Sequence, residues 1–395
     1  MNMSSIQTPS STLLTRTAAN ITAFALVLLG MQGVATAATI TVPGDHATIQ
    51  AAINAATDGD RVEVAAGTYK ERINFNGKNI HVIGVAGRDS TTIHATQSGR
   101  FPATLANNES SSAILEGFTL RGGYAGFGSS GGVGLRLNSD AIVRDCIISN
   151  NSAELGGNIG DDISVGVYIQ GGSPRLERVI IRDNLADVGG ASGTVLQTGV
   201  RINGGSPHLE NVLIHNNRND AGGNSGVSYY TGIYQTSGNS TLDHVTITNN
   251  KAKDFGGGLN PTYRPGIFVA NGTLTMTNSI VKGNFDNGSS ANDIVQGPVT
   301  ANYSNAPVTG GTGNINADPL FIDPSNRDFT PGCGSPVIDT ANSAIAVDVY
   351  GTSRPLDGDG QGSAVADMGA IEAPADSDVD GDGVTLCNDN CPTIS

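Results

Sequence analysis

LERVIIRDN (residues 176–184) is one copy of a pattern that this chain repeats five times. The other copies are VRDCIISNN (143–151), LENVLIHNN (209–217), LDHVTITNN (242–250) and MTNSIVKGN (276–284). Their final residues, Asn151, Asn184, Asn217, Asn250 and Asn284, are separated by 33, 33, 33 and 34 residues. A fixed period in this range indicates stacked supersecondary units, and alternating, β-branched apolar residues indicate strands. Stacked asparagines can hydrogen-bond side chain to side chain, so we predict a ladder of asparagines along a solenoid.

A second strand opens each repeat, directly after a glycine. These glycines are Gly134, Gly166, Gly199, Gly232 and Gly266, and a further glycine column (Gly157, Gly190, Gly223, Gly257) marks a long loop after each asparagine. The pattern resembles the right-handed parallel β-helix of the pectate-lyase-like superfamily, over roughly Ala38 to Asn284. We therefore predict an all-β protein, a right-handed parallel β-helix over residues 38–300, with a short N-terminal capping helix at Thr48–Ala56. The resemblance implies the fold more than an activity, because this fold carries lyases, hydrolases, esterases, epimerases and adhesins.

The first 37 residues read as a secretory signal peptide. Arg16 precedes an apolar stretch, Ala23 to Gly30, and Ala35-Thr-Ala37 is a small-residue cleavage site. The alternative is an uncleaved membrane anchor, for which the apolar run is short. We predict a secreted protein, extracellular or attached to the cell surface, with no transmembrane segment in the mature chain.

Several separated motifs follow the repeats. They are Ala317-Asp-Pro-Leu-Phe321, Ser335-Pro-Val-Ile-Asp339, Asp348-Val-Tyr-Gly-Thr-Ser-Arg354-Pro and Asp367-Met-Gly-Ala-Ile-Glu372. This segment, placed at residues 301–375, resembles the choice-of-anchor Q module that follows β-helices on exported bacterial proteins. The resemblance implies surface display or sorting and says little about chemistry.

The tail, residues 376–395, resembles one thrombospondin type 3 repeat. Alternating aspartate and glycine supply the hard oxygen ligands and the sharp turns of a calcium loop. The calcium ligands predicted on this basis are Asp376, Asp378, Asp380, Asp382 and Asp389. The alternative interpretation is a disordered acidic linker.

The composition limits the classes of partner that the chain is expected to bind. The chain carries a net charge of −15, which disfavours nucleic acid. An acidic polysaccharide requires a local basic patch or bridging calcium. The sequence does not predict an oligomeric state.

One column of outward residues on the second strand has the chemistry for binding sugars. Guanidinium groups bind carboxylates in two-point fashion, and flat aromatic faces suit sugar rings. We predict that these residues, one strand spacing apart, bind an extracellular polysaccharide or a cell-surface glycan; the alternative is that they only cover one another. The column consists of Arg136, Tyr168, Arg201, Tyr234 and Phe268.

The long loops after the glycine column are expected to wall a cleft. A polysaccharide lyase needs a group that neutralises the uronate, a base and an acid. The candidates are Arg201 or Arg264 for neutralisation and Tyr230, Tyr263 or His215 for proton transfer. A glycoside hydrolase would need clustered carboxylates, for which Asp161, Asp162 and Asp187 are the candidates. His215 also belongs to a solvated outward column with Arg182, Thr248 and Lys282.

Two hypotheses on function remain. The first is an exported, surface-displayed β-helix protein that binds acidic polysaccharide and, if it is an enzyme, cleaves it. The second is a non-catalytic adhesin or surface scaffold. Enzymes of this fold usually interrupt the repeat with a long insertion at the active site, and the regular spacing here favours the second hypothesis slightly.

Overall fold

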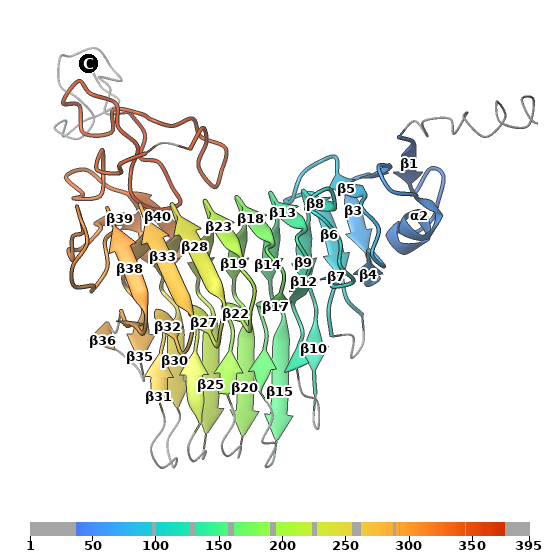
Figure 1. The fold of residues 1–395 in the computed structure, drawn as a ribbon, viewed down its shortest axis with the longest axis horizontal. Helices are drawn as coiled ribbons and strands as arrows, with labels where there is room; N and C mark the ends of the chain where they lie inside the picture. The colour runs from blue at the N-terminus through green and yellow to red at the C-terminus, as the bar shows by residue number, and fades with distance from the viewer. Residues whose placement is uncertain are drawn as a thin grey trace, which may run out of the picture. The chain divides into compact units, whose positions relative to one another are not determined.

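The chain forms a parallel β-solenoid built from short strands (Figure 1). The computed structural model describes residues 37–96, 100–126, 131–156, 162–189, 195–222, 227–254, 262–286, 290–291, 293–343 and 345–375. Five sheets run along the solenoid, and each complete coil contributes one strand to each of them. We call them sheets A to E. Among the described residues, no helix is long and apolar enough to cross a membrane.

Sheets A, B and C enclose the main core. Sheet A contains β1 (Thr39–Val42), β2 (Arg61–Val64), β5 (His81–Gly84), β8 (Ile114–Glu116), β13 (Ile142–Arg144), β18 (Arg175–Glu177), β23 (His208–Glu210), β28 (Asn239–Asp243), β33 (Thr273–Thr277) and β38 (Val299–Asn302). Sheet B contains β3 (Gly67–Tyr69), β6 (Thr91–His94), β9 (Thr119–Arg121), β14 (Ile147–Ser149), β19 (Ile180–Arg182), β24 (Leu213–His215), β29 (Thr246–Thr248) and β34 (Ile280–Val281). Sheet C contains β4 (Ile73–Asn74), β7 (Ala103–Leu105), β12 (Leu135–Asn138), β17 (Val167–Gly171), β22 (Val200–Ile202), β27 (Ile233–Gln235), β32 (Ile267–Val269) and β37 (Val295–Gln296).

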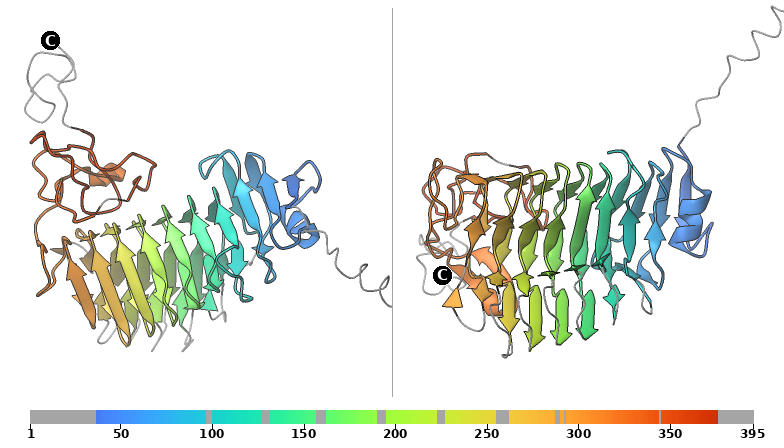
Figure 2. Two further views of the ribbon diagram at one scale, coloured as in Figure 1. Left: turned by 45° about the horizontal axis from the view of Figure 1, so that its top comes forward. Right: turned by 60° about the horizontal axis from the view of Figure 1, so that its bottom comes forward.

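From residue 124 onward, sheets D and E extend the coils beyond the main core and pack on each other (Figure 2). Sheet D contains β10 (Tyr124–Ala125), β15 (Ser152–Gly156), β20 (Leu185–Gly189), β25 (Arg218–Gly222), β30 (Lys251–Asp254), β35 (Phe285–Asp286) and β36 (Ser290–Ala291). Sheet E contains β11 (Gly131–Gly132), β16 (Ile163–Ser164), β21 (Val195–Gln197), β26 (Ser228–Tyr230) and β31 (Thr262–Arg264). A second core lies between them, built on small residues from sheet D, such as Ala153 and Ala186, and larger ones from sheet E, such as Leu196 and Tyr229.

The predicted asparagine ladder is confirmed, at the turn between sheets B and D. The side chain of each asparagine donates from Nδ2 to Oδ1 of the next, at 2.9–3.0 Å. The residue before each ladder asparagine has a left-handed backbone, for example Asp183 and Asn216. Asparagine, aspartate and glycine tolerate that conformation best, which explains why those residues hold the position.

The glycines that open sheet C are required by close packing of the coils. A Cβ at Gly166 would collide with the carbonyl oxygen of Gly199, and one at Gly199 with that of Gly232. A helix is also present at the predicted position, α2 (Ile49–Ala55), with Thr48 as its N-cap. Ile49, Ala52 and Ile53 are buried in the main core.

Three sequence predictions need correction. The segments expected as long loops, at Asp187, Tyr229–Tyr230 and Tyr263–Arg264, are instead strands of sheets D and E, because a second core buries their alternate residues. The boundary expected at residue 300 falls inside β38, and Ala301 and Ala306 belong to the main core. The column expected to be solvated contains His215, which is 3 % exposed.

His215 is buried because a C-terminal module, residues 318–375, packs on the outer face of sheet B. The module contains β39 (Phe321–Asp323), the 3-10 helix η1 (Pro324–Asn326) and β40 (Asp328–Pro331). Its Phe329, Val349 and Ile371 cover the outward residues Ile147 and Ile180. Cys146 is a core residue, as predicted, and Cys333 is disulfide-bonded.

Candidate functional site

The predicted column of outward residues exists on the outer face of sheet C. Its residues pair in register as Arg136, Tyr168, Arg201, Tyr234 and Phe268 on consecutive strands. The flanking residues of each strand, such as Val167 and Ile169, lie in the main core. Alternation along the strand therefore turns the column outward, and parallel pairing spaces it at about 4.8 Å per coil.

Arg201, at the centre of the column, is held from four sides. Its guanidinium carbon lies 5.7 Å from the ring centre of Tyr168 and 5.8 Å from that of Tyr234. Nη2 contacts Asp162 Oδ2 at 2.7 Å, and Nε donates to Asn203 Oδ1 at 2.8 Å. Arg201 is only 7 % exposed. Its charge is already compensated by Asp162, so Arg201 organises the column rather than offering an open cationic group.

Sheet E supplies a second side to this surface. The ring of Tyr230 stacks on Tyr234 with centroids 4.0 Å apart and lies 5.6 Å from Phe268. The next strand of sheet E places Arg264 in register with Tyr230, and its guanidinium lies 4.2 Å from the ring centre of Phe268. We call this surface the C–E corner: the five column residues together with Tyr230 and Arg264.

Two arginines of the C–E corner have no carboxylate partner in the described part of the chain. Within the described residues, neither Arg136 nor Arg264 forms an ion pair; Arg136 donates to Gln170 Oε1 at 2.7 Å, and Nε of Arg264 is buried without a hydrogen bond. Among the described residues, the corner therefore carries two positive charges without a paired carboxylate, in a chain whose net charge is −15.

A hollow continues the corner toward the N-terminus. The outward column extends from Arg136 to Thr104 and Asn74 on the preceding strands of sheet C. These two residues line a cavity of about 520 Å³ together with Phe101, and the guanidinium of Arg136 lies 5.9 Å from the ring centre of Phe101. The surface available to an extended ligand is thus longer than the five-residue column.

The structure does not bring all five predicted catalytic residues together. Arg201, Tyr230 and Arg264 meet at the C–E corner. Tyr263 stacks on Tyr229 at 5.3 Å and packs against the core between sheets D and E. His215 lies on sheet B, with its ring 5.0 Å from that of Phe329 in the C-terminal module.

Tyr230 and Tyr234 lack the electrostatics of a catalytic base. Burial raises the pKa of Tyr230 and also the pKa of Tyr234. A base that removes a proton near neutral pH needs a pKa close to the working pH. The geometry and the raised pKa values therefore favour binding over proton abstraction.

Sequence reasoning missed Asn203 and Phe101. Asn203 lies two residues after Arg201, and that spacing places both on one face of an extended strand, so this contact could have been found. Phe101 belongs to an early, shorter coil that does not share the regular period, and no sequence signal places it beside Arg136.

His215 makes the docking of the module sensitive to acid. Burial lowers the pKa of His215 to about 4, while the arginines Arg182 and Arg327 act in the same direction. The neutral form stabilises the folded state fully above the unfolded pKa of 6.5, and this contribution is lost as the pH falls toward 4. Between these values we expect the wild type to lose about 3 kcal/mol relative to His215→Gln.

The measurement is chemical unfolding of both proteins at several pH values, because the difference between them cancels the other titrating groups. The same substitution at the more exposed His208 of sheet A serves as control. A constant difference between wild type and His215→Gln across this pH range would contradict the prediction.

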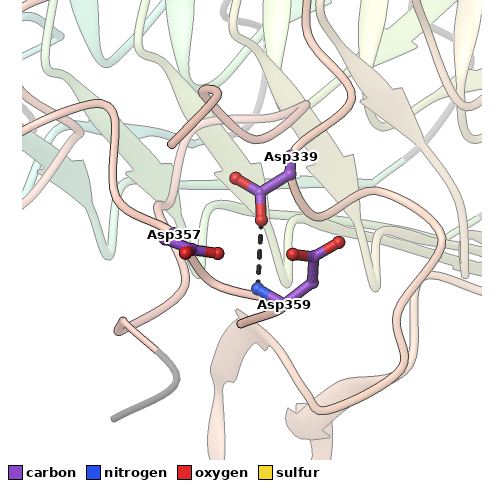
Figure 3. A group of neighbouring side chains, drawn as sticks. All are labelled: Asp339, Asp357 and Asp359. Atoms are coloured by element: carbon purple, nitrogen blue, oxygen red, sulfur yellow. Dashed lines mark hydrogen bonds between the residues drawn. The ribbon is translucent and has the colours of Figure 1, made fainter. Parts of the chain in front are cut away.

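Three aspartates of the C-terminal module also lie close together (Figure 3). Carboxylate oxygens of Asp339, Asp357 and Asp359 lie within 4.8 Å of one another, and Asp339 Oδ2 accepts a hydrogen bond from the Asp359 backbone at 3.0 Å. Burial and the neighbouring Asp359 raise the pKa of Asp339. Exposed acidic groups of this kind are common without an ion, so we assign this one no ligand. The predicted calcium ligands of the tail lie outside the described residues.

The fold and the corner define a parallel β-solenoid with an arginine- and aromatic-rich outer face. No protein-family model and no curated protein matches the sequence. Among solved structures, the chain is similar to that of pectate lyase Pel9A, at 13% identity and a TM-score of 0.38, covering 87% of this chain and 98% of that one. It is also similar to pectin methylesterase from carrot, at 13% identity and a TM-score of 0.31, covering 74% and 91%. Similarity at this level carries no argument about chemistry.

Proposed function

We propose that the chain is an exported, surface-attached protein whose C–E corner binds an acidic polysaccharide. The observation that carries the proposal is the pair of uncompensated guanidinium groups, Arg136 and Arg264, at either end of an aromatic column. Guanidinium groups bind carboxylates and sulfates with two parallel hydrogen bonds. From β12 to β32 the column spans four strand spacings, roughly 19 Å, which suits a polymer better than a single sugar.

The corner is built for binding rather than cleavage. Arg201 is fixed by Asp162 and Asn203, and its two neighbouring tyrosine rings occupy the guanidinium faces. What a glycan meets is the outer edge of this stack. An adhesin or scaffold that holds an acidic glycan without cutting it agrees with this geometry. The acidic tail would add bound calcium to such a display protein.

The test is binding of wild type and variants to polygalacturonate and alginate, each with calcium and with a chelator. We expect the double variant Arg136→Gln/Arg264→Gln to bind at least about tenfold more weakly, since each charge-assisted contact contributes about 1.5–3 kcal/mol. Arg175→Gln, on sheet A, is the matched control, because it removes a partly exposed arginine from a different face.

The same samples can be assayed for unsaturated uronate products by ultraviolet absorbance, and we expect none. An increase in absorbance that Arg201→Ala or Tyr230→Phe abolishes would make the chain a lyase. Equal binding by the double variant and by Arg175→Gln would remove the C–E corner as the binding surface.

A further inference from the structure

A cationic cavity lies on the outer face of sheet B, whereas the C–E corner lies on sheets C and E. Its volume is about 260 Å³, and three parts of the chain line it: the loop that contains Arg88, the outer face of sheet B at Arg182, and the C-terminal module at Arg327 and Tyr350. Ile147 and Ile180 provide an apolar surface within the same cavity. The cavity is thus an open hollow at which segments far apart in the sequence meet.

The positive charge around this cavity exceeds what its carboxylates compensate. Arg182 and Arg327 share one partner, Asp183, at 2.6 and 2.9 Å. Arg88 donates to two backbone carbonyls, those of Arg178 at 2.8 Å and Val349 at 2.6 Å, and in the described part of the chain it forms no ion pair. Three guanidinium groups and one carboxylate, Asp89, line the cavity, and Asp183 pairs with two of the arginines just outside the lining.

His215 lines the cavity, and its neutral imidazole carries one acceptor nitrogen. Its Nδ1 lies 2.8 Å from Asn216 Oδ1, and because an amide oxygen only accepts, Nδ1 carries the proton. Nε2 is then a lone-pair acceptor, and within the described residues it has no hydrogen-bond partner. Burial keeps this imidazole neutral near pH 7, since its pKa is lowered to about 4.

This set of groups specifies a ligand with three features. The guanidinium groups require an oxyanion, the free nitrogen of His215 requires a hydroxyl donor, and Ile147, Ile180 and the Tyr350 ring suit the C–H face of a ring. The volume lies just below the roughly 300–1,000 Å³ of cavities that hold drug-sized ligands. A single acidic sugar unit has all three features and this size.

We propose that this cavity binds one acidic monosaccharide unit, with its carboxylate on Arg182 and Arg327 and a hydroxyl on Nε2 of His215. The site is separate from the C–E corner and does not depend on the function proposed there. Because solenoid, loop and module all contribute to it, the bound sugar stabilises the docked module by mass action.

The experiment is a ligand-observed NMR titration of the full chain with galacturonate, with its neutral counterpart galactose and with sulfate. We expect galacturonate to bind, galactose to bind at least about tenfold more weakly, and Arg182→Gln or Arg327→Gln to weaken galacturonate at least about tenfold. Arg175→Gln, on sheet A and outside both proposed sites, should leave this binding unchanged. Galacturonate affinity that is insensitive to Arg182 and Arg327, or equal affinity for galactose, would overturn the proposal.

A second variant separates a sugar site from a simple oxyanion site. His215→Phe keeps a flat ring beside Phe329 and removes the acceptor nitrogen. The affinity for galacturonate should therefore fall severalfold, while the affinity for sulfate should not change. The unfolding midpoint of each variant without ligand shows whether it is folded. Loss of galacturonate and sulfate binding in equal proportion, or of neither, in a folded His215→Phe protein would reject the acidic sugar as the ligand.

Discussion

Replacing Asn217 by aspartate is expected to lower the free energy of unfolding by about 4 kcal/mol. The change is nearly isosteric, so it leaves packing intact and tests the polar interactions of the side chain. Asn217 is fully buried in the middle of the asparagine ladder. Its Nδ2 donates to Asn250 Oδ1 at 3.0 Å and to the carbonyl oxygen of Ile181 at 2.9 Å.

An aspartate at position 217 would place its carboxylate oxygens against other hydrogen-bond acceptors. Both donated bonds of Asn217 are lost, and a carboxylate then faces the Ile181 carbonyl and the amide oxygen of Asn250 in a dry environment. Oδ1 of Asn217 also accepts from the side chain and the backbone of Asn184, at 2.9 and 3.2 Å, and the aspartate keeps these two bonds. The cost therefore comes from two unsatisfied acceptors and a buried charge, each worth about 1–3 kcal/mol or more.

Urea unfolding followed by circular dichroism measures this effect, and we expect the midpoint to fall by more than about 1 M. Asn271→Asp is the matched control, because Asn271 is exposed and makes a single side-chain bond, to the carbonyl oxygen of Thr236 at 3.2 Å. That control should change the free energy of unfolding by less than about 1 kcal/mol. Comparable losses in the two variants would mean that the ladder adds no stability beyond that of an ordinary surface asparagine.

The asparagine ladder also shows what a sequence can predict in a repeat protein. Once a period is recognised, every position in a coil has a known neighbour one coil away. The register of Arg201 with Tyr168 and Tyr234 follows from the 33-residue spacing alone, and so does the burial of Cys146 beside Val179. These are relations between equivalent positions, and stacking determines them.

Relations between non-equivalent positions were harder to predict. The stack of Tyr230 on Tyr234 depends on the angle between sheets E and C within one coil, which no periodicity encodes. Sheet E itself was missed because its strands are three residues or shorter and follow glycine-rich segments. The aromatic pair at 229–230 was the available signal, since adjacent residues of a strand turn to opposite faces of its sheet.

The repeats contain a sequence pattern that could have predicted the docking of the C-terminal module. The runs Cys146-Ile-Ile148 and Val179-Ile-Ile181 contain three consecutive apolar residues, whereas a strand with one solvated face should alternate. The middle residues, Ile147 and Ile180, are the ones that the module covers. Partner identity was not predictable, because the module has little regular secondary structure and its contacts come from scattered loops.

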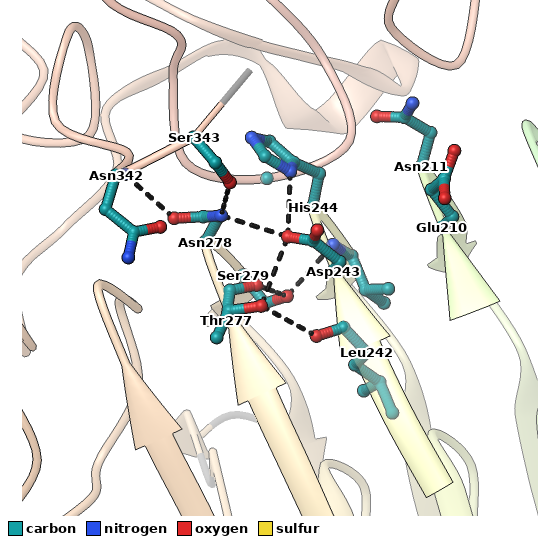
Figure 4. Close-up of polar contacts among 12 residues, drawn as sticks. Glu210, Asn211, Leu242, Asp243, His244, Thr277, Asn278, Ser279, Asn342 and Ser343 are labelled. Atoms are coloured by element: carbon teal, nitrogen blue, oxygen red, sulfur yellow. Dashed lines mark hydrogen bonds and ion pairs between the residues drawn. The ribbon is translucent and has the colours of Figure 1, made fainter. Parts of the chain in front are cut away.

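The polar contacts at this interface are as specific as the apolar ones (Figure 4). Asn278 donates from Nδ2 to Asp243 Oδ1 and to Ser343 Oγ, each at 2.9 Å, and accepts from the Asn342 backbone at 3.0 Å. His244 is fully buried, with Nδ1 3.0 Å from Asp243 Oδ1. The module is therefore positioned by groups at the corner between sheets A and B as well as by the face of sheet B.

The largest loss within the module is expected from Arg354→Met, at about 4 kcal/mol. The side chains of Arg354 and Glu372 have no exposed surface, and Nε lies 3.3 Å from Glu372 Oε2 as an ion pair without hydrogen-bond geometry. Nη1 and Nη2 donate to the carbonyl oxygens of Asp367 and Gly369, at 3.2 and 2.8 Å. Methionine fills similar space and removes the only positive charge that the structure shows in contact with this buried glutamate.

Limited proteolysis of the full chain is the measurement, since a destabilised module should be cleaved within residues 318–375 while the solenoid persists. Arg327→Met is the control inside the same module, because Arg327 is half exposed and pairs with Asp183 at the surface, where such pairs contribute up to about 1 kcal/mol. Adding Glu372→Leu to Arg354→Met should restore much of the resistance, because the unpaired charge is then gone. Equal protease resistance of wild type and Arg354→Met would show that the buried pair does not hold the module together.

The dependence of this variant on pH identifies charge as the cause of its instability. Burial raises the pKa of Asp367 to about 7 and also raises the pKa of Glu372, even with Arg354 nearby to oppose the shift. A carboxyl with a raised pKa in the folded state binds its proton more tightly there than in the unfolded chain. The stability it contributes is complete below the unfolded value near 4 and is lost as the pH rises through about 7. Without Arg354 both shifts increase, so Arg354→Met should approach wild-type protease resistance at pH 5 and lose it at pH 8. Loss of packing alone would make the variant equally sensitive at both pH values.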